Sequence, residues 1–540
     1  MSVKPVILCE AKGMTMSEIK KNDEFEIEIT DMSNDGEGIG HANGMTFFVK
    51  DAVVGDVIIA GATKLKKTYG YARIVRLVQP SVYRSVPACP ISRRCGGCQL
   101  QQMNYASQLE FKQKKVMDAL TRIGGIGKDR FSFDGTDDGI EFYPIIGMDD
   151  PFHYRNKGQF PVGADKNGNV ICGFYATHSH DIVDTKSCLL QHDITDELMT
   201  AVRGYMTECG IGAFYGNNGE IRESVENLNA MPKTKTAGRG KSRNRSEGDE
   251  NGKYAGSGKN IVRHVLTRVG FTTHEVMVCV VIAADTLPCE ERLVRLLNDA
   301  VEKYNTKNNA DYCLNSVSYC VNTENTNVIM GEKVVNIAGL PYITDYIGDT
   351  RYRISPLSFY QVNPVQTEKL YSTALEFAAP DKNDTVWDLY CGIGTISLYF
   401  AKHVKKVFGI EIVPQAIEDA TENARLNGIT NAEFFCGAAE ELFPKLMIST
   451  EQGTVQESKT VAPDIVIVDP PRKGCDAALI DCIGTLSPRK LVYVSCDPAT
   501  LARDIKLLAG YGYEPVKIRP CDMFPQTGHV ETVVSLIKNT

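Results

Sequence analysis

The chain has 540 residues, of which 43% are hydrophobic and 23% charged, and this is an ordinary globular composition. The length predicts about three or four domains and excludes a chain that is disordered throughout. The net charge of −8 argues against a uniformly basic nucleic-acid binder but leaves local basic patches open. No apolar run has the length of a membrane span, and the N-terminal apolar stretch is too short and interrupted for a signal peptide. We therefore expect a cytoplasmic, monomeric protein with no membrane partner.

Cysteine is the unusual component, with 17 copies in the chain. In a reducing compartment, cysteines serve as buried apolar residues, metal ligands or catalysts, and not as a disulfide framework. The sequence must therefore show which few of them carry chemistry.

Residues 20–79 predict a small β-barrel. Short runs of alternating polar and apolar residues are separated by turns rich in Gly, Asn and Asp. The last strands carry basic residues around Tyr69 and Tyr71, namely Lys64, Lys66, Lys67, Arg73 and Arg76. Basic side chains between aromatic ones suit an RNA-binding face. The alternative is a solvated sheet edge on which lysines prevent aggregation.

The middle of the chain predicts a mixed α+β domain, built from residues 80–100 and 140–340. Residues 101–139 predict a helical segment that packs on the C-terminal domain. Residues 223–260 contain almost no apolar side chains, and we interpret them as a disordered surface insertion. The basic residues of this insertion could contact a phosphate backbone, although a tolerated loop is the simpler explanation.

Residues 341–540 alternate short apolar strands with helices, which predicts a doubly wound, Rossmann-like α/β domain. Gly392 and Gly394 form a turn between a strand and a helix, and Glu411 ends the next strand. Asp469 follows a further strand, so these residues are expected at one sheet edge. The set favours S-adenosylmethionine (SAM) over NAD because the pyrophosphate fingerprint is incomplete. The alternative is an α/β domain without a nucleotide.

Cys496 ends a strand and precedes Asp497 and Pro498, which are a typical helix N-cap and first helical residue. A thiol at a helix N-terminus is biased toward the reactive thiolate. Glu531 begins the last strand, and we expect it to face the same pocket as Cys496. The alternative for Cys496 is a small buried apolar residue. The His529-Val530-Glu531 triplet also matches part of the zinc deaminase signature, but no Pro-Cys-x-x-Cys follows, which excludes that reading.

Cys89, Cys95 and Cys98 lie close together around a Gly-Gly pair. Three thiolates with one further ligand suit either zinc or an iron–sulfur cluster. The spacing by itself does not decide between zinc and an iron–sulfur cluster.

Several long motifs resemble the RNA (uracil-5-)-methyltransferase family. They are Phe359–Asn363, Asp388–Thr395, Asp469–Arg472, Ser495–Asp504, and Asp522–Pro525 with Gly528–Thr532. The resemblance covers nearly the whole chain, and the N-terminal barrel resembles the TRAM module of the ribosomal-RNA members. It implies that Cys496 is the nucleophile and Glu531 the general base. It also implies that Gln361, Tyr390, Glu411 and Asp469, with the Gly392–Gly394 turn, line the SAM site; for Asp469, contact with the uracil edge is the alternative.

The resemblance further implies Cys188 as the fourth ligand of the cysteine set. It favours a structural [4Fe–4S] cluster that orients the RNA-binding region, with zinc as the alternative. The implied function is methylation of C5 of a uridine in RNA, with 23S ribosomal RNA favoured by the barrel and the cysteines. Transfer RNA is the alternative substrate. A non-catalytic RNA-binding assembly factor and a small-molecule methyltransferase are the competing classes.

Overall fold

The computed structural model describes residues 19–133, 135, 139–214, 260–324, 326–451 and 462–539, without the side chains of 448–451. The chain forms two compact units. The first comprises Met1–Tyr154, Ile347–Tyr352 and Ser358–Thr540, and the second comprises Arg155–Tyr346 and Arg353–Leu357. Except for Asn260, the expected insertion 223–260 lies outside the described residues.

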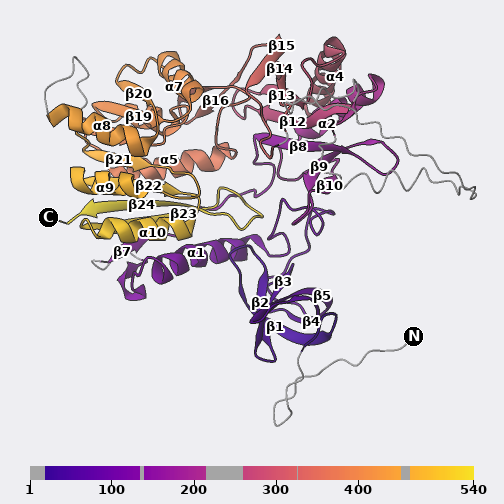
Figure 1. The fold of residues 1–540 in the computed structure, drawn as a ribbon, viewed down its shortest axis with the longest axis horizontal. Coiled ribbons are helices and arrows are strands. Elements are labelled where there is room, and N and C mark those ends of the chain that lie inside the picture. Colours follow the sequence, from indigo (N-terminus) through magenta and orange to yellow (C-terminus); the bar gives the residue numbers. More distant parts are fainter. Residues whose placement is uncertain are drawn as a thin grey trace, which may run out of the picture. The chain divides into compact units, whose positions relative to one another are not determined.

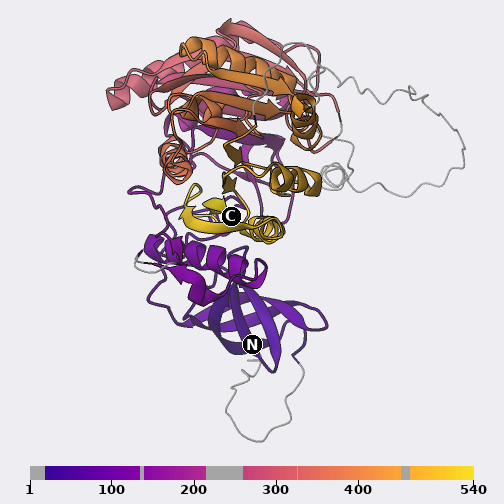
Figure 2. The same cartoon turned by 90° about the vertical axis from the view of Figure 1, so that its left-hand side faces the viewer.

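The predicted N-terminal barrel is confirmed. Its strands close in the order β1-β2-β3-β5-β4 (Figures 1 and 2). They are β1 (Glu24–Met32), β2 (Gly38–Ala42), β3 (Met45–Lys50), β4 (Val57–Leu65) and β5 (Tyr69–Gln79). Alternate residues of β1 point into the barrel, so that Phe25, Ile27 and Ile29 are buried in its core.

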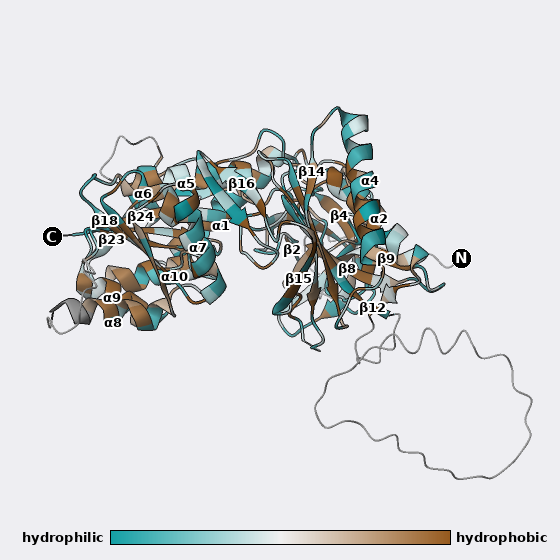
Figure 3. Cartoon of the chain, turned by 90° about the horizontal axis from the view of Figure 1, so that it is seen from above, coloured by the Kyte–Doolittle hydropathy of each residue, from teal (hydrophilic) through white to brown (hydrophobic). Residues whose placement is uncertain are grey.

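The second unit is built on one mixed sheet in the order β10-β9-β8-β12-β13-β14-β15, with β11 beside β12. Its strands are β8 (Lys157–Ala164), β9 (Val170–Tyr175), β10 (Ile182–Asp184), β11 (Gly212–Ala213), β12 (Asn260–Val269), β13 (Glu275–Ile282), β14 (Cys313–Val321) and β15 (Lys333–Gly339). Helices α2 (Ile194–Glu208) and α4 (Glu290–Asn308) pack against each other and share a hydrophobic core with the sheet. The strands are mainly hydrophobic and the outer side of α4 is hydrophilic (Figure 3).

The C-terminal part confirms the predicted Rossmann-like α/β fold. Its sheet has the order β20-β19-β18-β21-β22-β24-β23-β7-β6. The strands are β6 (Phe131–Ser132), β7 (Ile140–Phe142), β18 (Thr385–Asp388), β19 (Lys406–Glu411), β20 (Ala432–Cys436), β21 (Ile465–Val468), β22 (Lys490–Ser495), β23 (Tyr513–Cys521) and β24 (Glu531–Lys538). Strands β18 to β22 run parallel, whereas β24 is antiparallel to both of its neighbours.

Helices cover both faces of this sheet (Figure 1). They are α1 (Tyr105–Arg122), α5 (Pro364–Ala378), α6 (Thr395–Ala401), α7 (Pro414–Leu426), α8 (Ala439–Glu451), α9 (Ala477–Leu486) and α10 (Pro498–Ala509), with a short 3-10 helix at Lys128–Arg130. Helices α1, α8, α9 and α10 contribute to one hydrophobic core around the fully buried Trp387. This core includes Val116 and Leu120 of α1, the helix of the predicted helical segment 101–139.

Two segments that we assigned to the central domain belong instead to the first unit. They are residues 80–100 and residues 140–154. Residues 140–154 belong there because β7 pairs with β23 of the C-terminal sheet. This parallel pairing joins segments that are far apart in sequence, so local pattern could not reveal it. The chain passes between the units near the β16 (Ile343–Ile347) and β17 (Thr350–Ile354) hairpin.

Among the helices in the described part of the chain, none combines the length and apolar content needed to cross a bilayer.

Candidate functional site

The residues that the sequence analysis singled out gather at the carboxyl edge of the C-terminal sheet. Asp388 ends β18 and Glu411 ends β19. Asp469 directly follows β21, and Cys496 directly follows β22. These strands are parallel, so their carboxyl ends share one edge, where ligands bind in open α/β sheets.

The antiparallel strand β24 brings Glu531 to the same edge. In the β22–β24 ladder, Ser495 pairs with Thr532. Cys496 directly follows Ser495 after the end of β22, and Glu531 directly precedes Thr532 at the start of β24. Burial raises the pKa of the Cys496 thiol, and the two side chains are close enough for the Glu531 charge to raise it further. The thiol and the carboxylate therefore belong to one site.

Three acidic side chains in this site are shifted toward their neutral forms. Burial, reinforced by the negative charge of Asp469, raises the pKa of Glu531 to about 8. Burial and the charge of Asp388 raise the pKa of Asp469 to about 7. Burial likewise raises the pKa of Asp388 to about 6, although Ser397 donates a 2.7 Å hydrogen bond to its Oδ2. Carboxyls that exchange protons near neutral pH suit acid–base chemistry.

The structure corrects the expectation that the helix N-terminus lowers the pKa of Cys496. Burial and the carboxylates of Glu531 and Asp469 raise the pKa of this thiol to about 12. The first free N–H groups of α10 do not point at the sulfur, because the Asp497 side chain accepts hydrogen bonds from Ala499 N at 2.9 Å and Thr500 N at 3.0 Å. The Cys496 side chain is therefore a protonated thiol near neutral pH.

One cation reaches the rim of this site. Arg472 is exposed, and its Nη2 atom lies 3.5 Å from the Nε2 atom of His529. Its positive charge lowers the pKa values of Cys496 and Glu531. Burial and the nearby Arg472 lower the pKa of His529 to about 4. This imidazole is consequently neutral at physiological pH and does not supply a second charge.

The glycine turn after β18 has the features of a nucleoside cradle. Gly392 and Gly394 have φ angles of 53° and 81°, which favour glycine. A side chain at Gly392 would meet nothing within 4 Å, so the turn borders open space. The Glu411 carboxylate lies beside it and accepts hydrogen bonds from Gly392 N at 3.2 Å and Val413 N at 2.9 Å.

The same cradle contains an acceptor without a protein partner. The Oδ1 atom of Asp388 is buried and has no hydrogen-bond partner among the described residues. A buried polar atom of this kind calls for a donor from a ligand. The acidic donor set and the open glycine turn therefore fit SAM, which carries ribose hydroxyls, an ammonium group and a sulfonium charge.

The two remaining predicted cofactor residues differ in their surroundings. Gln361 is buried just before α5, whose N-cap is Asn363. Tyr390 packs against the hydrophobic core, and its hydroxyl lies beside Cys475. The backbone of Tyr390 therefore borders the glycine turn, whereas its hydroxyl lies beside Cys475 instead.

The cysteine loop lies in the first unit, after the barrel. Gly97 N donates to the Cys95 sulfur at 3.4 Å, and the Gln101 side-chain amide donates to the Cys98 sulfur at 3.2 Å. Such N–H donors suit thiolates. Even so, among the described residues no group of three or more His, Cys, Asp and Glu side chains is arranged to hold a metal ion. Cys188 belongs to the second unit.

The sequence analysis did not predict a group of buried polar contacts, here called the clamp, between α1 and the loop before β24. Lys112 of α1 donates to Asp522 Oδ1 and, at 3.0 Å, to Phe524 O. Both side chains of the Lys112–Asp522 ion pair have 0% exposure. Tyr105 also donates to Asp522 Oδ2 at 2.9 Å. The clamp fixes the loop that leads to Glu531.

Two glutamines extend this clamp to the cysteine loop. Gln108 Nε2 donates to Gln526 Oε1 at 3.0 Å, and Gln526 N donates to Gln108 Oε1 at 3.0 Å. The Gln526 carbonyl in turn accepts from Gln99 N and Leu100 N, each at 3.0 Å. The loop carrying the cysteines and the loop preceding the carboxylate are therefore hydrogen-bonded to each other.

Replacing Lys112 with methionine is expected to destabilise the first unit by about 3–5 kcal/mol, because the Asp522 carboxylate would remain buried without its partner. Adding Asp522→Asn should recover a large part of that loss, since the uncompensated charge is then gone. Chemical denaturation of the two variants measures both effects. A Lys112→Met variant as stable as the parent would contradict the clamp, and the exposed Lys114→Met on the same helix is the matched control.

Two family models match this chain. The model for tRNA (uracil-5-)-methyltransferase matches residues 335–539, and the TRAM domain model matches residues 19–75. A Clostridium acetobutylicum protein named as an RNA methyltransferase is 38% identical over 520 residues, which cover 96% of this chain and 98% of that protein. The chain belongs to the RNA (uracil-5-)-methyltransferase family. It is therefore an RNA methyltransferase that uses SAM.

Other similar proteins also cover nearly all of this chain. A Halalkalibacterium halodurans protein, also named as an RNA methyltransferase, is 39% identical over 522 residues, with 96% of this chain and 98% of that protein covered. The crystal structure of Pyrococcus abyssi tRNA (uracil-54, C5)-methyltransferase with S-adenosyl-L-homocysteine is 25% identical and has a TM-score of 0.65. That match covers 95% of this chain and 99% of the archaeal one.

Proposed function

We propose that this enzyme methylates C5 of a uridine in RNA through a covalent bond between Cys496 and C6 of the uracil. The observation that carries this proposal is the pairing of Ser495 with Thr532 at the ends of β22 and β24, because Cys496 and Glu531 are the residues that adjoin this pair. It unites a nucleophile and a base, the pair that covalent catalysis with separate proton removal requires.

The residue types follow from the chemistry of uracil. The Cys496 thiol gives its proton to water, the resulting thiolate adds to C6, and the electrons of the C5–C6 double bond move onto the C4 carbonyl as an enolate. C5 is then nucleophilic and takes the electrophilic methyl group that SAM would supply, with S-adenosylhomocysteine as the leaving group. Glu531 removes the proton from C5, the C5–C6 double bond forms again, and the bond between C6 and the Cys496 sulfur breaks.

On this account, the site residues divide the work by position. Asp388, Glu411 and the Gly392–Gly394 turn hold SAM, with Gln361 and the backbone of Tyr390 at the edge of that site. Asp469 lies electrostatically between Asp388 and Glu531, because its charge influences the pKa of Glu531 and the Asp388 charge influences its own. We assign Asp469 to the SAM site, with contact to the uracil edge as the alternative. The uridine must be unstacked to reach Cys496 with its C6 edge.

Turnover should rise as the pH increases from about 6 to 9, because Glu531, with its pKa raised to about 8, must be ionised to act as a base. Asp469→Asn removes a negative neighbour and should therefore move this acid limb to lower pH. Burial is the larger cause of the raised Glu531 pKa, and it remains in the variant. The midpoint of the acid limb should therefore stay above the usual pKa range of glutamate. Single-turnover rates at saturating RNA and SAM measure the limb. An unmoved midpoint in Asp469→Asn would contradict the coupling.

For the substrate we propose ribosomal RNA, on the resemblance of the barrel and cysteine loop to the ribosomal-RNA members. Transfer RNA is the second candidate. It is favoured by the Pyrococcus abyssi structure, which is named for uracil-54 of transfer RNA and covers 95% of this chain.

Tritium release tests the function and the substrate together. RNA labelled with [5-³H]uridine loses tritium to water when the C5 proton is replaced by methyl. We expect SAM-dependent release from ribosomal RNA, and release confined to transfer RNA would support the second candidate. A lack of release from both RNAs would refute the proposed function.

We further propose that Cys89, Cys95, Cys98 and Cys188 hold a structural [4Fe–4S] cluster, with zinc as the alternative. N–H donors are directed at the sulfurs of Cys95 and Cys98, as suits metal-bound thiolates, although burial raises the pKa of the Cys95 thiol. Anaerobically purified protein should be brown and absorb near 400 nm (about the usual range for such clusters). A colourless protein with stoichiometric zinc would refute the cluster, and Cys188→Ser should lower the metal content in either case.

A further inference from the structure

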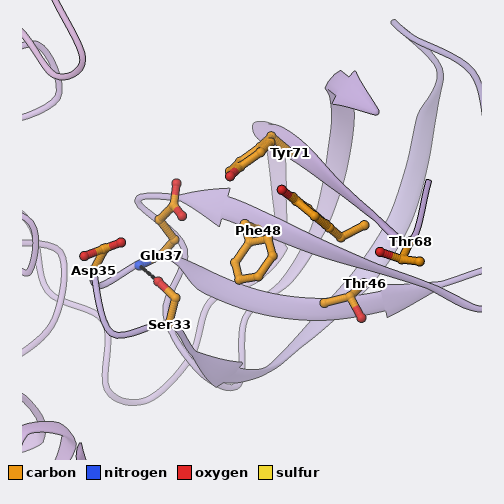
Figure 4. A pocket seen from close by; sticks show the side chains of 8 residues that line it. Ser33, Asp35, Glu37, Thr46, Phe48, Thr68 and Tyr71 are labelled. Atoms are coloured by element: carbon orange, nitrogen blue, oxygen red, sulfur yellow. Dashed lines mark hydrogen bonds between the residues drawn. The ribbon is translucent and has the colours of Figure 1, made fainter. Parts of the chain in front are cut away.

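The second unit holds a pair of cysteines that neither the proposed function nor the proposed cluster uses. Cys209 directly follows α2 and Cys289 directly precedes α4, and these two helices pack against each other. The pair is a different feature from the surface pocket of the barrel, which has a volume of about 480 Å³ around Phe48 (Figure 4). All residues that line this pocket lie within residues 19–75, so the pocket belongs to the TRAM module.

Two contacts hold the end of α2 against the start of α4. The Tyr205 hydroxyl donates a hydrogen bond to the Pro288 carbonyl. The Arg292 Nε atom donates to Glu208 Oε2 at 2.6 Å, and the two side chains form an ion pair. One cysteine directly follows Glu208 and the other directly follows Pro288. The two thiols are therefore carried by backbone segments whose neighbouring residues are already bonded to each other.

The two thiols also contact each other. The side chains of Cys209 and Cys289 are hydrogen-bonded, and the charges of both influence the Tyr205 hydroxyl. Thiols in hydrogen-bonding contact need only a small movement to reach the S–S bond length of about 2.05 Å. Cys289 is exposed and Cys209 is half-buried, so a dissolved oxidant reaches Cys289 more easily. Burial and the hydrogen bond to Cys289 raise the pKa of the Cys209 thiol to about 11, which leaves Cys209 protonated near neutral pH.

A metal site explains this pair less well than redox chemistry does. Structural zinc takes four protein ligands, and two thiols supply only half of them. In the described part of the chain, no group of three or more His, Cys, Asp and Glu side chains is arranged to hold a metal ion. Two adjacent thiols without further ligands suit conversion to a disulfide instead.

We propose that Cys209 and Cys289 form a modification site at which hydrogen peroxide converts the two thiols into a disulfide. The Cys289 sulfur attacks one peroxide oxygen, the O–O bond breaks, and the other oxygen leaves with the thiol proton as water. The Cys209 sulfur then attacks the sulfenic acid on Cys289. The S–S bond forms, the S–O bond breaks, and the hydroxyl group leaves with the Cys209 proton as water. The peroxide is thus reduced to water while the two thiols are oxidised, and an added dithiol reverses the change.

The disulfide should stabilise the second unit. It would join the end of α2 to the start of α4, two points that are far apart in the chain. A cross-link over a long segment stabilises a fold mainly by restricting the unfolded chain. We expect peroxide-treated parent protein to unfold at a temperature about 5 °C or more above that of equally treated Cys289→Ser. Equal unfolding temperatures would contradict the expectation that these thiols are placed for a disulfide.

Peptide mapping of the full chain after peroxide treatment tests the site directly. Reduced protein is treated with a small molar excess of hydrogen peroxide, free thiols are alkylated, and a tryptic digest is analysed without reduction. Trypsin releases Cys209 in the peptide of residues 204–222 and Cys289 in the peptide of residues 269–292. We expect these two peptides to be linked, and to separate after dithiothreitol. Fragmentation should place the bond on Cys289 and not on Cys279, which shares the second peptide and has 0% exposure.

Three variants decide the role of each thiol. Cys289→Ser should give no linked peptide. Cys209→Ser removes the second thiol, so Cys289 should stop at the sulfenic acid, which dimedone labels. Cys313→Ser removes another exposed thiol of the second unit and should give the link as the parent does. Separate, fully alkylated peptides in the treated parent would overturn the proposal, and so would a bond from Cys289 to another cysteine or equal oxidation of Cys313.

Discussion

Replacing Cys496 with alanine should abolish methyl transfer. Without the sulfur no bond forms to C6 of uracil, and C5 remains too weak a nucleophile to take the methyl group. Loss of a covalent nucleophile costs about 10⁴-fold or more in turnover. Transfer of radiolabelled methyl from SAM to RNA measures this loss.

The Cys496→Ala variant should still bind RNA, because the substitution removes only one half-buried sulfur from the sheet edge. Cys482→Ala is the matched control, since it removes a half-buried thiol from α9 and should leave turnover unchanged. Turnover by Cys496→Ala well above background would contradict the nucleophile assignment. Loss of RNA binding in this variant would indicate a structural role instead.

Glu531→Gln should stall the reaction after methyl transfer. Glutamine occupies nearly the same volume but cannot accept the C5 proton, so elimination of Cys496 is blocked. Removal of a general base costs about 10²–10⁴-fold in turnover. The variant should therefore accumulate methylated RNA bound covalently to the protein, visible as a slower band on a denaturing gel.

The double variant Cys496→Ala and Glu531→Gln is the control for this trap, and it should show no slower band. Rapid release of methylated RNA by Glu531→Gln would assign the base role to another group. Asp469, with its pKa raised to about 7, would then be the next candidate.

The general architecture could be predicted from the sequence because local pattern carries it. Alternating short apolar strands and helices predict the C-terminal α/β fold, and period-two strands with glycine turns predict the barrel. Membership of β6 and β7 in the C-terminal sheet has no local signal, since β7 pairs with β23, where Glu141 and its partner Lys517 are 376 residues apart in the chain. The burial of Lys112 is a second feature that local sequence pattern could not predict. Lysines in amphipathic helices usually face solvent, and only the distant Asp522 explains its burial.

The residues of the site could be predicted from the sequence, but their pKa shifts could not. Strand ends placed Glu411, Asp469 and Cys496 at one edge, which the parallel strands bear out. The direction of the Cys496 pKa shift was predicted wrongly, because the sequence shows the helix that follows Cys496 but not the carboxylates across the sheet. Sequence motifs also could not show that Asp497 occupies the first N–H groups of α10.

Trapping the covalent intermediate on 5-fluorouridine RNA tests the central claim most directly. Fluorine replaces the proton at C5, so Glu531 has no proton to remove and the adduct cannot break down. With SAM, the parent enzyme should form a stable complex with this RNA, and mass spectrometry of the digested complex should locate the modified nucleotide on the peptide containing Cys496. Absence of a complex, or its attachment to any other cysteine, would contradict the mechanism.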